Sequence, residues 1–160
     1  TDLQALKIVR EMAESLGSHW ITTDAKSHDE AVALISHLPV LISSALIRTV
    51  GEERNPVVRE LAQTLASTGF ADTSRVGGGN PYLGTAMASS NTEAIIKGLA
   101  TYRWSLEQLE EAILGENWAK LQTELERTQL LRPRFLHSNA DLIKPASEED
   151  PSQPSTDDKP

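Results

Sequence analysis

The chain has 160 residues, of which 39% are hydrophobic, with a formal net charge of −8 and a pI of about 5.0. This length is enough for one domain with a hydrophobic core, and the acidic balance argues against nucleic acid or an anionic membrane surface as a partner, because no basic field attracts phosphates. The absence of cysteine excludes disulfides and Cys-ligated metals. The N-terminus lacks the apolar core of a signal peptide, and no apolar run approaches the roughly 20 residues that span a bilayer.

The first predicted element is a helix that begins after Thr1 or Asp2 and ends at Gly17, with apolar residues near helical spacing. The next segment, His19–Thr22, is apolar and β-branched and predicts a strand. One strand cannot make a sheet, so it would either join a sheet outside this chain or remain extended. The chain also begins directly on a helix cap without an initiator Met, which we interpret as the sign of a fragment or a processed product.

A long apolar helix is predicted from about Ser27 to Val50, opened by the capping-box pattern Ser27-His28-Asp29-Glu30 and closed by Gly51. Apolar residues occupy almost every side of it, so we expect it to be buried within a bundle or between subunits. Pro39 lies in its middle, where it removes a backbone donor and is expected to force a kink.

Two Asn-Pro pairs predict helix starts, because asparagine caps a helix and proline suits its first position. Asn55-Pro56 opens a helix to about Ser67, and Asn80-Pro81 opens a shorter one to about Ser89.

The remaining helices are predicted over residues 92–114, with Asn91 as cap and Gly115 after the last turn, and over residues 117–131. From His137 onward the chain has four prolines and almost nothing to bury, and its six acids and two lysines give it a charge of −4. This composition predicts a disordered tail.

The segment from Asp72 to Pro81 is the strongest candidate for a binding site. Its polar residues and the glycines at 77–79 predict an irregular loop in which φ can be positive and a ligand can approach the backbone. The helix N-terminus at Asn80, the hydroxyls of Thr73 and Ser74, and the planar guanidinium of Arg75 all favour an anion. The alternative is a plain helix connection whose arginine caps a carbonyl. The segment lacks the G-x-G-x-x-G and Walker patterns, so no nucleotide loop is predicted.

His37 is the second candidate, because Ser36-His37-Leu38-Pro39 places a histidine in an apolar helix, just ahead of a kink. A lone histidine there is more often a satisfied core residue than a catalyst. No metal-binding spacing of His, Asp or Glu is present in the sequence, so we expect no metal.

Three strings together, SHLPVLISSALI, GFADTSRVGGGNPYLGTAMASSN and YRWSLEQLEEAI, resemble the C-terminal half of the prephenate/arogenate dehydrogenase family, and most of all its cyanobacterial, arogenate-using branch. The resemblance covers about residues 27–131. It implies an all-α, intertwined helical dimerisation domain like the C-terminal domain of 6-phosphogluconate dehydrogenase. Residues 1–26 then resemble a helix-strand remnant of a Rossmann domain, residues 27–136 the dimerisation and substrate domain, and residues 137–160 a disordered acidic tail.

The family implies a cytoplasmic homodimer that oxidises arogenate or prephenate with NADP or NAD and releases carbon dioxide, giving tyrosine or hydroxyphenylpyruvate. The cofactor site and the catalytic histidine would belong to a domain outside this chain. Arg75 matches the arginine that binds a substrate carboxylate, and Thr73, Ser74, Asn80 and His37 are expected around it. Many prephenate-using members have a second histidine where this chain has Val40, which favours arogenate. The alternative is a stand-alone helical dimerisation or anion-binding module without redox activity.

Overall fold

The computed structural model describes residues 2–18 and 20–136, and over these residues it contains helices and no β-strand. The chain divides into two compact units, one made from Thr1–Thr22 with Gln122–Pro160 and the other from Thr23–Leu121. The acidic tail expected from His137 onward lies outside the described residues. The all-α fold class predicted from the sequence is confirmed.

In the first unit, helix α1 (Leu3–Ser15) begins at Asp2, whose carboxylate accepts from the backbone N–H of Gln4, and ends before Gly17, which has a φ of +69°. The strand predicted at His19–Thr22 is wrong for its described part, since residues 20–22 have no regular secondary structure. Trp20 folds back on α1 instead. Its ring lies 3.9 Å from the guanidinium carbon of Arg10, and its indole N–H donates to Glu14 Oε1 at 2.9 Å.

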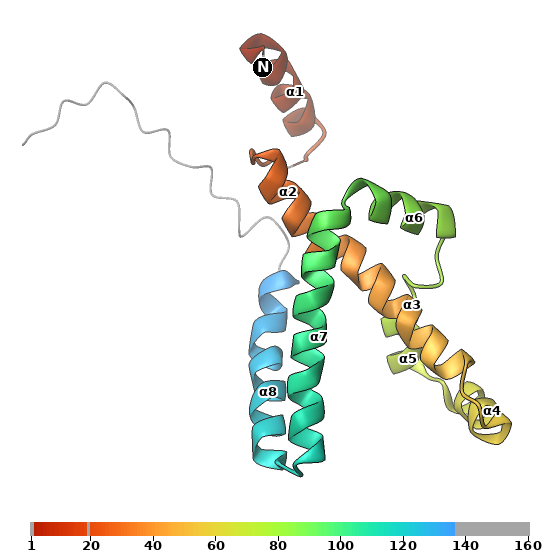
Figure 1. The fold of residues 1–160 in the computed structure, drawn as a ribbon. Coiled ribbons are helices and arrows are strands. Elements are labelled where there is room, and N and C mark those ends of the chain that lie inside the picture. Colours follow the sequence, from red (N-terminus) through yellow and green to blue (C-terminus); the bar gives the residue numbers. More distant parts are fainter. Residues whose placement is uncertain (1, 19, 137–160) are drawn as a thin grey trace, which may run out of the picture. The chain divides into compact units, whose positions relative to one another are not determined.

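The second unit is built on one long helix, which Figure 1 shows as the continuous orange ribbon of α2 (Ala25–Val32), the π-turn η1 (Ala33–His37) and α3 (Leu38–Gly51). The helix begins earlier than the expected capping box, because Asp24 is its N-cap and accepts from Ser27 N–H at 3.0 Å. Hydrogen bonds from the Ser27 side chain and backbone lower the pKa of the Asp24 carboxyl.

The kink expected at Pro39 takes the form of the π-turn that immediately precedes it. Leu38 N–H bonds the carbonyl of Ala33, five residues back, rather than that of Leu34. Pro39 has no N–H and cannot donate to the carbonyl four residues before it, so the regular series of α-helical hydrogen bonds is already interrupted at this point. The wider π-turn lies at the same place. Turns of this kind often occur at functional sites.

Shorter helices flank the long one. Helix α4 (Pro56–Leu65) and helix α6 (Pro81–Ser90) start at the predicted caps, since Asn55 Oδ1 accepts from Val57 N–H and Asn80 Oδ1 accepts from Tyr82 N–H. Between them, α5 (Thr68–Ser74) corrects the prediction of an irregular segment from Asp72, because residues 72–74 are its last turn. Helices α4 and α5 contact α3, and α6 contacts η1.

Helix α7 (Thr92–Leu114) has the predicted bounds and contacts α2, η1, α3 and α6. A turn follows it, in which Glu116 has a φ of 48°. Helix α8 (Trp118–Leu131) follows, and the short 3₁₀ turn η2 (Arg132–Phe135) ends the described chain.

Few apolar side chains of the described residues are buried within one copy of the chain. The buried apolar residues are Ala33, Leu38, Ile95 and Ala112, whereas Val57 is 70%, Ile96 59% and Trp104 60% exposed. The long helix Ala25–Gly51 is also long and apolar enough to cross a membrane by length and composition alone, contrary to the expectation that no such segment exists. The isolated chain therefore leaves much apolar surface to be covered by something else.

Candidate functional site

The candidate loop is fastened to α3 by two serine hydroxyls. Ser43 Oγ donates to the carbonyl of Thr73 at 2.8 Å. Ser44 Oγ lies 3.1 Å from the carbonyl of Gly77 and 2.9 Å from that of Val40, so its one hydrogen is shared between the loop and its own helix. The Ser43 side chain is buried, so its hydroxyl depends on this bond for a partner. The two bonds hold both sides of Arg75 against the helix.

Gly77 explains why this loop needs glycine, and the reason differs from the one expected. None of the glycines at 77–79 has a positive φ. Instead, a Cβ at Gly77 would lie 2.4 Å from the Ser43 carbonyl carbon and 2.4 Å from the Ser44 nitrogen, which are both backbone atoms. Only a residue without a side chain permits this approach of loop to helix.

Thr73 and Ser74, which the sequence placed in the site, use their hydroxyl hydrogens inside α5. Thr73 Oγ1 donates to Gly69 O at 2.8 Å, and Ser74 Oγ donates to Phe70 O at 2.6 Å. Ser74 is buried as well. A hydroxyl has one hydrogen, so in this arrangement neither side chain can donate to an anion.

Arg75 has the opposite character. Its side chain is exposed at the end of α5, and its guanidinium makes no hydrogen bond or ion pair with any of the described residues, so in this part of the chain it caps no carbonyl. Five residues further on, Asn80 starts α6, whose first N–H groups form the positive end of a helix dipole. The loop thus offers a cation and a helix N-terminus to a ligand.

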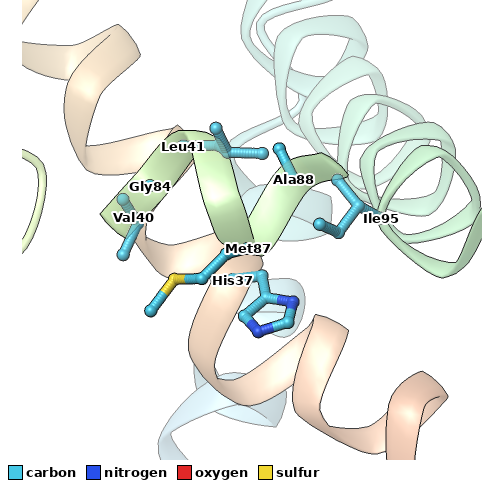
Figure 2. A pocket seen from close by; sticks show the side chains of 7 residues that line it. All are labelled: His37, Val40, Leu41, Gly84, Met87, Ala88 and Ile95. Atoms are coloured by element: carbon cyan, nitrogen blue, oxygen red, sulfur yellow. The ribbon is translucent and has the colours of Figure 1, made fainter. Parts of the chain in front are cut away.

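A shallow groove lies between α6 and the long helix, as Figure 2 shows. It is lined by His37, Val40, Leu41, Gly84, Met87, Ala88 and Ile95. The roughly 160 Å³ of empty space between these side chains includes open solvent, and the groove encloses no cavity of its own. A substrate would therefore need walls beyond those that one copy of this chain supplies.

The groove and the loop share one face of α3. His37 and Ser44 are seven residues apart, which brings them to nearly the same side of the helix about 10 Å apart along its axis. Val40 lies between them, and the position of a Cβ on Gly84 would be 3.8 Å from Val40 Cγ1. The structure therefore brings His37, Val40 and the base of the Arg75 loop to one side of the long helix.

Sequence reasoning missed Asn91, which was expected only as a helix cap. It makes no side-chain cap bond to α7. Its amide nitrogen donates to Asp29 O at 2.7 Å and lies 3.5 Å from His37 Nδ1. These partners are 62 and 54 residues away in sequence, so no local pattern could have revealed them.

Nothing in the described part of the chain suits a metal or a dinucleotide. These residues contain no group of three or more His, Asp or Glu side chains that could hold an ion. They also contain no strand, and the sequence has no G-x-G-x-x-G turn, so a nicotinamide cofactor finds no phosphate-binding unit among them. The chemistry available here is anion binding and hydrogen bonding.

Residues 24–127 match the family model described as "Prephenate dehydrogenase, dimerization domain". The chain is similar to the prephenate dehydrogenase of Lactococcus lactis subsp. cremoris, with 26% identity over 82% of this chain and 37% of that protein. It is also similar to the cyclohexadienyl dehydrogenase of Zymomonas mobilis, with 28% identity over 82% of this chain and 45% of that protein. The chain thus spans less than half the length of these relatives.

Among solved structures, the arogenate dehydrogenase of Synechocystis matches with a TM-score of 0.80 and 45% identity, covering 85% of this chain and 49% of that one. The prephenate dehydrogenase of Aquifex aeolicus, solved in complex with hydroxyphenyl propionate and NAD⁺, matches with a TM-score of 0.77 and 26% identity, covering 84% of this chain and 46% of that one.

Proposed function

Because the chain belongs to the prephenate dehydrogenase dimerization-domain family, we propose that it is the substrate-binding and dimerisation part of an arogenate or prephenate dehydrogenase. The complete enzyme would oxidise the hydroxyl-bearing ring carbon of its substrate, with loss of carbon dioxide, to give tyrosine or hydroxyphenylpyruvate. NADP or NAD would accept the hydride, and the residues that hold it would lie outside this chain.

The observation that carries this proposal is the exposed guanidinium of Arg75, which has no partner among the described residues and stands beside the N-terminus of α6. A planar fork of donors suits a carboxylate, which it can bind through two parallel hydrogen bonds. We assign Arg75 to a carboxylate of the substrate. We propose that Asn80 and His37 contact the rest of that molecule, while Thr73 and Ser74 support the loop from within α5.

The lining of the groove favours arogenate over prephenate. Val40 lies beside His37 and Gly84 on the wall of the groove. An apolar side chain cannot donate to a keto group or a carboxylate, so this position of the wall offers nothing to the pyruvyl group of prephenate. The similarity to the arogenate dehydrogenase of Synechocystis supports the same choice.

We also propose that two copies of the chain cover one another's apolar surface. The stripe Val57, Leu61 and Leu65 on α4 is 70%, 55% and 68% exposed, and these residues recur every fourth position on one side of the helix. Monomeric soluble proteins rarely leave such surface open. A second copy could also cover the apolar surface of the long helix, so that no membrane is needed to cover it. This fits our proposal of a cytoplasmic enzyme without a nucleic-acid partner.

Sedimentation equilibrium should give a mass twice the 17.5 kDa of the chain. The physical reason is the burial of the exposed apolar side chains, at roughly 25 cal/mol per Å². Circular dichroism on the same sample reports whether the protein is helical. A stable monomer with full helix content would contradict the proposed dimer.

The test of the function itself is an assay of the complete protein with arogenate and with prephenate, each in the presence of NADP and of NAD. We expect reduced cofactor and tyrosine from arogenate, with a higher kcat/KM than for prephenate. Activity with neither substrate would overturn the enzyme proposal and leave a helical anion-binding module. A higher kcat/KM for prephenate would overturn the substrate assignment alone.

A further inference from the structure

Asn91 sits at a point where three segments of the second unit meet. Its backbone N–H donates to Met87 O at the end of α6, and its carbonyl accepts from Ile95 N–H in the first turn of α7. Its side chain reaches a third segment, since Nδ2 donates to Asp29 O in α2 at 2.7 Å. Met87 and Ile95 both line the groove, so Asn91 is fixed directly behind it.

The bond to Asp29 settles which way the Asn91 amide faces. A backbone carbonyl can only accept, so the group next to Asp29 O must be the NH₂ and not the amide oxygen. One of the two amide hydrogens is used in this bond. The other remains available on the same nitrogen.

The same nitrogen lies 3.5 Å from His37 Nδ1. An amide NH₂ only donates, so His37 Nδ1 can pair with it only by accepting, with a lone pair and no hydrogen on that nitrogen. In a neutral imidazole the proton then resides on Nε2, at the other edge of the ring. None of the described residues makes a hydrogen bond to Nε2, and the His37 ring lines the groove (Figure 2).

We propose that Asn91 is a positioning residue that holds His37 in the Nε2–H tautomer, so that Nε2 presents a hydrogen-bond donor to an oxygen of the molecule bound in the groove. The part about the ligand rests on the proposed function. The tautomer does not, because it follows from the contacts of Asn91 alone.

Nitrogen-15 NMR of the chain tests the tautomer directly. A protonated ring nitrogen and an unprotonated one have well-separated shifts, and the signals of His37 are assigned by their loss in His37→Gln. At a pH where the ring is neutral, we expect a protonated Nε2 and an unprotonated Nδ1. The reverse pattern, or equal populations of both tautomers, would overturn the proposal without any assay of activity.

Asn91→Asp should reverse the pattern, because a carboxylate only accepts and would draw the proton to Nδ1. The variant also loses the donor to Asp29 O, because a carboxylate cannot donate to a carbonyl, while the new charge is favourable at the N-terminus of α7. Circular dichroism checks that the helix content is retained. Asn55→Asp is the matched control, since it makes the same change at the cap of α4, away from His37, and should leave the His37 shifts in place. Unchanged His37 shifts in Asn91→Asp would exclude a positioning role.

In the complete protein, Asn91→Asp should raise KM at least ~tenfold relative to Asn55→Asp, since a hydrogen bond to a charged group is worth more than one factor of ten. A reversed tautomer with an unchanged KM would mean that Asn91 positions His37 but that the groove is not the substrate site. The tautomer measured by NMR tests this proposal, and the change in KM tests the proposed function.

Discussion

Arg75→Ala in the complete enzyme is expected to raise KM for the substrate at least tenfold, with little change in stability. The guanidinium is exposed and has no hydrogen-bond or ion-pair partner among the described residues, so its removal breaks no polar interaction with them. A charge-assisted pair with a carboxylate contributes about 1.5–3 kcal/mol, which corresponds to a factor of ten or more. Steady-state kinetics and a thermal melt measure the two effects separately.

Arg54→Ala is the matched control for this change. Arg54 is also exposed and also precedes an Asn-Pro helix start, but it stands ahead of α4 rather than α6. We expect it to leave KM unchanged. Arg75→Lys should fall between the two, because lysine keeps the charge and loses the planar fork. Equal KM values for Arg75→Ala and Arg54→Ala would remove Arg75 from the site.

Gly77→Ala is expected to lower the free energy of unfolding by about 1–3 kcal/mol, the typical cost of overpacking. The added Cβ would meet the backbone of Ser43 and Ser44 at 2.4 Å, and backbone atoms cannot rotate away as a side chain could. The loop must then move off α3, which lengthens the bond from Ser44 Oγ to Gly77 O. Urea unfolding followed by circular dichroism measures the loss.

The neighbouring glycine provides a sharp control. A Cβ on Gly78 would find only Arg75 O, at 4.0 Å, and Gly78 has no positive φ to strain. Gly78→Ala should therefore be neutral, or stabilising by the roughly 0.4–1 kcal/mol that a restricted unfolded chain provides. If both variants unfold at the same urea concentration as the parent, the close approach of Gly77 to α3 is not what fastens the loop.

The elements with local signals were predictable. The Asn-Pro pairs at 55–56 and 80–81 place a cap and a first helical residue side by side, and α4 and α6 begin there. The bounds of α7 follow in the same way from its apolar periodicity and the glycine after it. In these cases the interaction that decides the structure lies within a few residues of the signal.

The failures have long-range or competing causes. Residues 20–22 suit a strand by composition, but Trp20 gains more from stacking on Arg10 and bonding Glu14 on α1 than an unpaired strand can offer. The capping box at Ser27 lost to Asp24, an equally good cap three residues earlier. The Arg75 loop was found because its residue types point to an anion, whereas its anchors, Ser43 and Ser44, lie some 30 residues away.

The π-turn has a consequence for angular register along the long helix. In an unbroken α-helix, Asp29 and His37 would be separated by eight steps of about 100°, and so would stand about 80° apart around the axis. A turn closed over five residues takes up about one extra residue, which reduces the separation to about 20°. Asp29 and His37 then come to one side, where a single amide group can touch both. The loss or gain of one residue between 33 and 37 would break that alignment while leaving every groove residue on α3, α6 and α7 in place.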